Sequence, residues 1–411
     1  MIITRRRRVI FVNRFYYPDH SATAQILTDL AEALVAAAWQ VEVVTSRLQY
    51  ENPAIRLDSR SARAGVAIYR VATTSFGRAG IVGRLVDYLS FYFSAFFVLF
   101  AIARRGDLIV AKTDPPLLSV MAVLVARLRR ARLVNWLQDL YPEVAAELGV
   151  ATMRGPAGST LRRLRDVSLR TAVANVAIGD RMAERLTMLG VSADRIAVIP
   201  NWADDAAIRP IPPDQALFRR EWMLNSKFVV GYSGNLGRAH ESDTLFRAAL
   251  LLRDRPDIVF LMIGGGRENA TLAERVQASG LTNHFQFRPY QPREALSQSL
   301  AVADVHWLSL LPELEGLIVP SKFYGIAAAG RPVIAVTDPD GEIGRIAVRE
   351  GCGLAVMPGD ADGLAEVIRA LASDSGRVAA MGRAARALID RDYSRSAAIG
   401  RWKVLLERVA P

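Results

Sequence analysis

Short apolar runs alternate with longer stretches of helical periodicity along this chain, and the whole alternation occurs twice. In the first half the apolar runs include 9–12, 41–45 and 108–111, and a proline-rich break at 200–213 precedes the second series. Runs of this length between helical segments are typical of buried strands in a parallel sheet. The sequence therefore predicts an α/β chain of two doubly wound, Rossmann-like domains that face each other across a cleft.

The length of 411 residues provides for two buried cores. We expect an N-terminal domain at 1–205 and a C-terminal domain at 206–380. The last segment, 381–411, is predicted to be helical, with Trp402 on an apolar face that packs back on the first domain. Ligands of doubly wound sheets bind at the carboxyl ends of the strands.

The net charge of +11 is unevenly distributed. Residues 1–200 carry 27 lysines and arginines against 16 aspartates and glutamates, whereas residues 201–411 carry 25 of each. The densest basic runs are 5–8, 127–132 and 162–165. Few aromatic residues stand among their arginines, and none of the runs matches a nucleic-acid-binding module, so nucleic acid is not the expected partner. An anionic membrane surface is therefore the favoured partner, and a solvated basic face remains the alternative.

The segment Tyr88–Ala103 reads YLSFYFSAFFVLFAIA and contains no charge. It is short for a membrane span, which needs about 20 apolar residues. We expect a helix at 85–103 that lies in the membrane interface or covers the sheet with an apolar outer face. A fully buried core helix is the alternative.

Cysteine and histidine content limit the chemistry. The single cysteine, Cys352, excludes an internal disulfide and favours a reducing compartment. The four histidines are far apart in sequence, so we predict no metal site. No signal peptide is expected, because the basic run 5–8 is followed by only four apolar residues before Asn13.

Two loops favour phosphate binding. The loop 233–241 (SGNLGRAHE) follows a predicted strand, and its glycines let the backbone approach a ligand while Arg238 offers charge-assisted hydrogen bonds. In the second loop, Lys322 follows Pro320 and Ser321 at the start of a predicted helix, where anions bind readily. A tight turn with a surface arginine is the alternative for the first loop.

These motifs together resemble the family 4 glycosyltransferases of GT-B fold. The resemblance is carried by YSGNLGRAH at 232–240, GGG at 264–266 and GLIVPSK at 316–322, followed by AAGRPV at 328–333. In the first half, FYYPD at 15–19, SATAQ at 21–25, QDLYPE at 138–143 and IPNW at 199–202 are similar to the branch that builds exopolysaccharide and O-antigen repeat units.

The resemblance implies retaining transfer of a hexosyl or N-acetylhexosaminyl group from a nucleoside diphosphate sugar to a lipid-linked sugar acceptor, on the cytoplasmic face of the inner membrane. It also implies that the domain at 1–205 binds the acceptor and that the domain at 206–380 binds the nucleotide sugar. It implies no required cofactor or metal, because cationic side chains would stabilise the leaving diphosphate. The catalytic candidates are Asp139, Glu315, Arg238 and Lys322. The donor-binding candidates are Gly234, Asn235, Gly237, Arg238, His240, Gly264, Tyr290, Glu313, Glu315, Gly316, Leu317, Ile318, Ser321 and Lys322. The acceptor-side candidates are His20, Ser21, Ala22, Thr23, Gln138 and Asp139.

The chain departs from the family pattern at several of these positions. The family's paired glutamates fall at Leu317 and Gly325, so the ribose-binding carboxylate is missing and only Glu313 or Glu315 could meet the donor sugar. The family has an arginine early in its phosphate-binding loop, and this chain has Asn235 at that position. The family also has a histidine immediately before the acceptor-side aspartate, where this chain has Gln138 before Asp139. Asp139 could also be a structural residue of a turn.

Two other functions remain open at this point. A nucleotide-sugar epimerase of GT-B-like fold would use acids, bases and histidines, and it would need no acceptor. A non-catalytic nucleotide-sugar-binding scaffold at the membrane would bind lipid without turnover.

Overall fold

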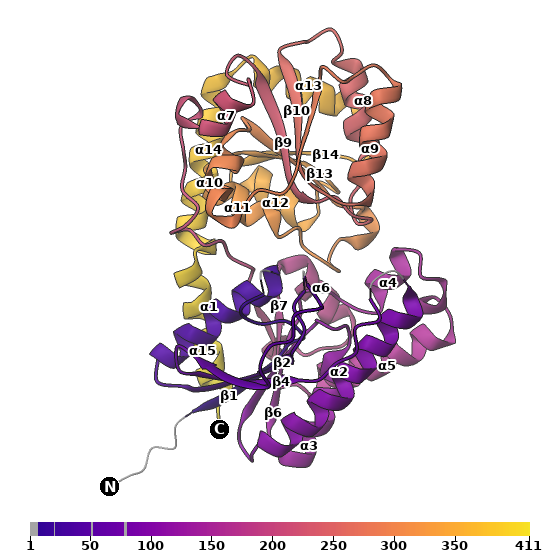
Figure 1. Cartoon of the computed structure of the whole chain (residues 1–411), viewed down its shortest axis with the longest axis vertical. Helices are drawn as coiled ribbons and strands as arrows, with labels where there is room; N and C mark the ends of the chain where they lie inside the picture. The colour runs from indigo at the N-terminus through magenta and orange to yellow at the C-terminus, as the bar shows by residue number, and fades with distance from the viewer. Residues whose placement is uncertain (1–6, 20, 51, 78–79) are drawn as a thin grey trace. The chain divides into compact units, whose positions relative to one another are not determined.

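The computed structural model describes residues 7–19, 21–50, 52–77 and 80–411 (Figure 1). The chain forms two compact units, one of Met1–Pro200 with Ile399–Pro411 and the other of Asn201–Ala398. Residues 201–205, expected in the first domain, therefore belong to the second unit. Of the C-terminal segment, 381–398 belongs to the second unit and 399–411 to the first.

The first unit is built on an eight-stranded sheet of order β3-β4-β2-β1-β5-β6-β7-β8. Val9 of β1 lies opposite Val41 of β2 and Leu108 of β5, so the apolar runs form the centre of the sheet. The strands are β1 Arg8–Val12, β2 Gln40–Ser46, β3 Arg60–Arg63, β4 Val66–Val71, β5 Leu108–Lys112, β6 Arg132–Trp136, β7 Ala174–Ala177 and β8 Ile196–Val198.

One edge of this sheet differs from the fully parallel arrangement predicted. Strand β3 pairs antiparallel with β4, with Arg60 opposite Tyr69. Its sequence, RSAR, contains no large apolar residue and is largely exposed, so it carries no pattern of a buried strand.

The helices of the first unit cover the two faces of its sheet. They are α1 Ala22–Ala36, α2 Ile81–Ile102, α3 Leu118–Arg129, α4 Glu143–Glu147, α5 Pro156–Thr171 and α6 Asp180–Met188. Helix α15 Arg395–Val409 begins in the second unit and ends in the first. Trp402 of α15 is fully buried against Trp136, with ring centroids 4.5 Å apart.

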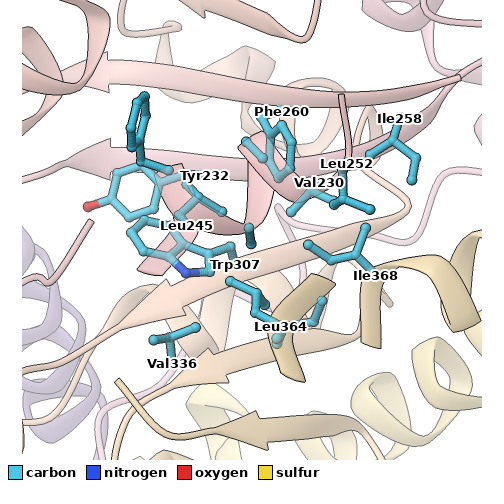
Figure 2. Packing of buried hydrophobic residues seen from close by; sticks show 14 of the residues in the cluster. Val230, Tyr232, Leu245, Leu252, Ile258, Phe260, Trp307, Val336, Leu364 and Ile368 are labelled. Atoms are coloured by element: carbon cyan, nitrogen blue, oxygen red, sulfur yellow. The ribbon is translucent and has the colours of Figure 1, made fainter. Parts of the chain in front are cut away.

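The second unit contains a six-stranded parallel sheet of order β11-β10-β9-β12-β13-β14. Its core includes Phe260, Trp307 and Leu364, which belong to one cluster of buried side chains between the sheet and its helices (Figure 2). The strands are β9 Phe228–Asn235, β10 Ile258–Gly265, β11 Phe285–Arg288, β12 Val305–Ser309, β13 Val333–Val336 and β14 Gly353–Val356. The helices are α7 Leu217–Glu221, α8 Asp243–Leu251, α9 Arg267–Ala278, α10 Leu296–Ala301, α11 Lys322–Ala328, α12 Glu342–Arg349, α13 Ala361–Ala372 and α14 Ser375–Leu388.

Two arginines of the predicted basic runs are internal. Arg8 pairs with Glu42 at 2.7 Å and with Asp107 at 2.5 Å, and its side chain is 8% exposed. Arg165 is 4% exposed and pairs with Glu143 at 2.7 Å. Removing one partner of such a buried pair costs about 3–5 kcal/mol, so both arginines belong to the fold. They are not available to a lipid surface, which corrects that part of the basic-surface interpretation.

Candidate active site

The second sheet has a topological switch point between β9 and β12. The chain proceeds from β9 to β10 and β11 on one side, and from β12 to β13 and β14 on the other. Loops that leave such neighbouring strands in opposite directions open a crevice at their carboxyl ends, where ligands of doubly wound sheets bind. The loops after β9 and β12 are the two phosphate-binding candidates of the sequence.

Three donor-side candidates meet at this point. Lys322, the first residue of α11, lies over Gly234, where a Cβ would be 2.4 Å from Lys322 Cε. Lys322 Nζ donates to His240 Nε2 at 3.4 Å, and His240 Nδ1 donates to Ser309 O at 2.6 Å. Residue 234 is therefore suited only to glycine, for two reasons. Its φ angle of 137° is one that other residues rarely adopt, and a Cβ would collide with the Lys322 side chain.

Both titratable groups of this cluster are shifted toward their neutral forms. Burial lowers the pKa of Lys322 to about 8. Burial, followed by the Lys322 charge, lowers the pKa of His240 to about 4, although the hydrogen bond to Ser309 opposes this shift. His240 is therefore neutral near pH 7 and accepts a hydrogen bond from the ammonium group. An anion beside Lys322 would supply the counter-charge that the cluster itself does not contain.

The remaining residues of the 233–241 loop are more open to solvent. Arg238 is exposed, and within the described residues its guanidinium makes no hydrogen bond or ion pair. The backbone of Asn235 accepts a hydrogen bond from Tyr232 Oη at 2.8 Å, which holds the end of β9. Gly237 is half-buried between these two positions. Arg238 is thus a second, solvent-exposed cationic side chain of the loop.

The glycine turn after β10 lies beside the same loop. At Gly264 the φ angle is 120°, and a Cβ there would lie 2.3 Å from Gly234 O, so no side chain fits. The ring of Tyr290 lies close to the same turn. Its Cε1 is 3.1 Å from the position that a Cβ at residue 264 would take. The tyrosine is 60% exposed, and an exposed aromatic ring over glycine backbone is suited to stack on a planar ligand group.

The loop after β12 uses its two acidic residues differently. The carboxylate of Glu315 accepts hydrogen bonds from Thr337 Oγ1 and, at 3.1 Å, from the Glu342 backbone N–H. Glu313 is exposed. Glu315 therefore holds the loop against the start of α12, whereas Glu313 is open to solvent.

The other candidates of this loop form its turn and the start of α11. Gly316 has a φ angle of 72°, Leu317 is buried and Ile318 is half-buried. Ser321 precedes α11 and is exposed. Gly325, where the family pattern has a glutamate, is half-buried in α11. This part of the site therefore offers backbone groups and Ser321 rather than a carboxylate.

The first sheet has its own switch point, between β1 and β5, and the acceptor-side candidates lie around it. Ser21 precedes α1, Ala22 is exposed and Thr23 is half-buried in its first turn. Gln138 is 8% exposed, and its backbone N–H donates to Thr113 Oγ1 at 3.2 Å. His20 lies outside the described residues.

A buried lysine, missed by the sequence reasoning, connects these loops. Lys112 is the last residue of β5; its Nζ donates to Thr23 O at 2.9 Å and lies 3.9 Å from the centroid of the Trp136 ring. Burial lowers its pKa well below the ordinary value, while Asp114 and Asp139 act in the opposite direction. The sequence does contain a signal for this residue, because a lysine ends the otherwise apolar run LIVAK at 108–112.

Asp139 is perturbed by the same group of charges. Burial and the Asp114 charge raise the pKa of Asp139 to about 6, and Lys112 opposes the shift. A carboxyl group with a pKa near the working pH can exchange protons with a substrate hydroxyl.

Helices α2, α3 and α5 carry a large exposed apolar surface. Helix α3 contacts both others, as Figure 1 shows for the first unit. Helix α2 buries Phe91, Ala95 and Leu99 against the sheet, so only one side of it is core, and the fully buried alternative is wrong. We call the exposed residues the apolar face: Val82, Leu85, Val86, Leu89, Phe93, Phe97, Phe100, Leu124, Leu128, Leu164 and Val167.

Helix α2 is also the one helix of the described chain that is long and apolar enough to cross a membrane, over Val82–Ile102, by length and composition alone. Only 22% of its most apolar window is buried.

No group of three or more histidine, cysteine, aspartate or glutamate side chains in the described parts of the chain is arranged to hold a metal ion.

Comparison with known proteins agrees with this architecture. The glycosyl transferase 4-like domain matches residues 21–202, and the glycosyl transferases group 1 domain matches residues 214–388. HepE of Anabaena, solved in complex with UDP, is 17% identical with a TM-score of 0.73, covering 98% of this chain and 100% of HepE. Sucrose-phosphate synthase of Thermosynechococcus elongatus is 18% identical with a TM-score of 0.75, covering 98% and 99%. Fold and domains thus define a glycosyltransferase of GT-B fold.

Two curated relatives narrow the class. The colanic acid biosynthesis glycosyl transferase WcaI of Escherichia coli strain K12 is 27% identical over 86% of this chain and 89% of WcaI. The glycosyltransferase WbjE of Pseudomonas aeruginosa is 30% identical over 71% of this chain and 72% of WbjE. The chain belongs to the family 4 glycosyltransferases.

Proposed function

We propose that this glycosyltransferase moves a sugar, with retention of configuration, from a nucleoside diphosphate sugar to a polyprenyl-diphosphate-linked glycan during surface polysaccharide biosynthesis. The observation that carries the donor class is the cluster of Lys322, His240 and Gly234 at the switch point, with Arg238 exposed on the adjoining loop. The likeness to WcaI, named for colanic acid biosynthesis, supports the polysaccharide context. The UDP bound to HepE makes a uridine nucleotide the first donor to test.

The chemistry assigned to the donor site is stabilisation of the leaving diphosphate. When the glycosidic bond to the diphosphate breaks, negative charge increases on its oxygens, and cations placed in a partly buried site stabilise that charge more than water does. Lys322 is held by its neighbours before the ligand arrives, and Arg238 can move to the outer oxygens. The acceptor proton can pass to the departing phosphate, so this route requires no metal and no strong protein base.

The membrane part of the proposal rests on the apolar face and its basic end. Arg129 Nε donates to Ala103 O at 2.8 Å, and an Arg127 Nη donates to Thr171 Oγ1 at 3.0 Å, so the last turns of α2, α3 and α5 lie together. Exposed arginines gather at this end: Arg104, Arg105, Arg127 and Arg130. Apolar side chains bordered by cations are suited to the interface of an anionic bilayer. We therefore place the enzyme as a peripheral protein on the cytoplasmic face of the inner membrane.

A thermal-shift panel of UDP, GDP, ADP, CDP and dTDP, each with magnesium and with EDTA, tests the donor class. One nucleoside diphosphate should raise the melting temperature equally in both conditions, because a ligand of the folded state stabilises it. Loss of the shift in EDTA would contradict metal-free binding, and no shift with any nucleotide would contradict the donor site.

The nucleotide sugar selected in this way is then incubated with glycosyl diphosphate acceptors, and NMR of the product reports its anomeric configuration. Inversion would contradict the retaining mechanism. Conversion of the nucleotide sugar without an acceptor would favour the epimerase, and binding without turnover would favour the scaffold.

A further inference from the structure

Lys112 is buried at the end of a central strand, where the fold alone does not account for a charged side chain. It is the last residue of β5 and is 1% exposed. Among the described residues its Nζ makes one hydrogen bond, to Thr23 O, and the ammonium group lies over the face of the Trp136 ring. A buried ammonium group with so few partners is costly, and an apolar side chain of the same length would stabilise the sheet more. The lysine is therefore a candidate for a role in the reaction.

The end of β5 joins two segments that carry acceptor-side candidates. Through its hydrogen bond of 2.9 Å to Thr23 O, Lys112 holds the first turn of α1. The hydroxyl of the next residue, Thr113, accepts a hydrogen bond from the Gln138 N–H at 3.2 Å, and Asp139 follows Gln138 in the loop after β6. Lys112 and Thr113 thus tie the first turn of α1 and the loop of Asp139 to the same strand end.

Asp139 differs from Lys112 in being open to a ligand. It is half-buried, and within the described residues its carboxylate makes no hydrogen bond or ion pair. Burial and the Asp114 charge raise the pKa of Asp139 to about 6, and the Lys112 charge opposes them. A cation that acts on a carboxylate without contacting it keeps the carboxylate ionised to a lower pH and leaves both oxygens to the substrate.

Other charged and titratable groups interact with Asp139 or with Tyr141, its neighbour in the loop. They come from the loop after β5 and from α2, and they are Asp114, Arg84 and Tyr88. Burial, followed by the Asp139 charge, raises the pKa of Tyr141, so this phenol stays neutral over the whole working range of pH. Within the described residues, Lys112 is therefore the cation that acts on Asp139 itself.

We propose that Lys112 is a positioning residue of the transfer reaction: its hydrogen bond fixes the first turn of α1, and its positive charge balances Asp139, so that an ionised carboxylate meets the acceptor hydroxyl. Because Lys112 is 1% exposed, it acts through these two partners and touches no substrate. The inference rests on the proposed function and adds to it a residue that controls the charge of the acceptor-side carboxyl group.

The charge role is tested first in the resting enzyme, without donor or acceptor. Lys112→Met keeps an unbranched side chain of similar length and removes the charge. Infrared difference spectra of each protein against its Asp139→Asn counterpart report the protonation of Asp139 as the pH is lowered. Loss of the cation should raise the pKa of Asp139 by about one pH unit or more, whereas Asp114→Asn should lower it. Val110→Ala, a buried change in the same strand that involves no charge, should leave it at the wild-type value.

Transfer to soluble undecyl diphosphates that carry a sugar is then measured as a function of pH. The acidic limb of kcat/KM for the acceptor should move to higher pH in Lys112→Met by the amount that the infrared titration gives. Lys112→Met combined with Asp139→Asn should have the same pH profile as Asp139→Asn alone. On the alkaline side, where Asp139 is ionised in both proteins, Lys112→Met should still lose activity several-fold, because the hydrogen bond to α1 is absent. Wild-type activity there would overturn the part of the inference that concerns α1.

If Lys112→Met does not fold, Lys112→Gln takes its place, because the amide also lacks the charge but still donates hydrogen bonds. The same rise in the pKa of Asp139 is expected. An Asp139 pKa equal to that of the wild type in the folded Lys112 variant would overturn the charge role while leaving the transferase intact. If the wild-type protein binds nucleotide but transfers no sugar to any of these diphosphates, the proposed function is overturned together with the role of Lys112 in it. The infrared titration, which needs no acceptor, distinguishes the two failures.

Discussion

Lys322 connects the burial of one side chain to the pH dependence of donor binding. Its pKa is lowered to about 8 by burial, so Lys322 loses its positive charge in the free site as the pH rises through 8, while Arg238 stays charged. Nucleoside diphosphates keep their charge over this range. We therefore expect the Kd of the diphosphate to rise several-fold between about pH 7 and about pH 9, measured by calorimetry.

Lys322→Ala should weaken transfer more than about tenfold and remove this pH dependence. Lys322→Arg is the matched control, because arginine stays protonated over the same range. Equal pH dependence in all three proteins would assign the titration to another group.

Asp139 should set the acidic limit of activity. Its pKa is raised to about 6, and the ionised carboxylate accepts a hydrogen bond from the acceptor hydroxyl more strongly than the protonated acid does. The value of kcat/KM for the acceptor should therefore fall as the pH drops below about 6, and Asp139→Asn should be weakly active at all pH values. A wild-type acidic limb that persists in Asp139→Asn would show that Asp139 serves the fold of its loop.

Gly325 allows the missing carboxylate to be restored. A Cβ at Gly325 would have only the side-chain ends of Ile208 and Leu300 within 4 Å, each at 3.9 Å, so a Cβ fits on α11 without displacing backbone. Gly325→Glu should strengthen nucleoside diphosphate binding several-fold, by about 1 kcal/mol, through a charge-assisted hydrogen bond to the ribose. Gly325→Gln has the same length without the charge, so equal affinity in both variants would argue against a ribose contact.

At the scale of the element, α2 has one buried face and one exposed apolar face. Phe93 is 68% and Phe97 54% exposed, whereas Phe91 is fully buried. Phe93→Ser with Phe97→Ser should therefore reduce binding to anionic vesicles, measured by flotation, more than about tenfold while the melting temperature stays near wild type. Met188→Ser, which removes an equally exposed apolar side chain from α6, is the control and should bind normally. Loss of folding in the double variant would contradict the exposed position of these rings.

The same helix shows what the sequence could predict. Its uncharged run predicted a helix near residues 85–103, and the repeated apolar runs predicted the sheets, because burial of a strand on both faces requires continuous apolar sequence. The run alone could not indicate which side faces the core, since nearly every position is apolar and periodicity is weak. Strand β3 was missed for the opposite reason, because RSAR is exposed and carries no apolar pattern.

At the candidate site, the motifs of two separate loops singled out Gly234, His240 and Lys322, because the residue types within one loop are local information. The roles of Glu315 and Lys112 could not be read in this way. Each depends on partners far along the chain, Thr337 and Glu342 for Glu315 and Thr23 for Lys112. Long-range contacts of this kind appear only when the strands are assembled.

For the whole molecule, the separation of charge predicts how membrane binding responds to salt. The excess of positive charge lies in residues 1–200, and the exposed arginines Arg104, Arg105, Arg127 and Arg130 border the apolar face. Each cationic side chain near an anionic surface contributes about 1 kcal/mol at low salt. The screening length falls from about 10 Å at 0.1 M salt to about 3 Å at 1 M. Binding to vesicles containing phosphatidylglycerol should therefore weaken more than about tenfold over this range.

Neutral phosphatidylcholine vesicles separate this electrostatic contribution from the apolar one. Binding to them should be weaker and nearly independent of salt, because only the apolar face contributes and hydrophobic burial is not screened. The charge variant Arg127→Gln with Arg130→Gln should reduce the salt dependence on anionic vesicles and leave binding to neutral vesicles unchanged. Salt-independent binding to anionic vesicles would instead mean that the apolar face alone holds the enzyme at the bilayer, and that the basic excess serves another purpose.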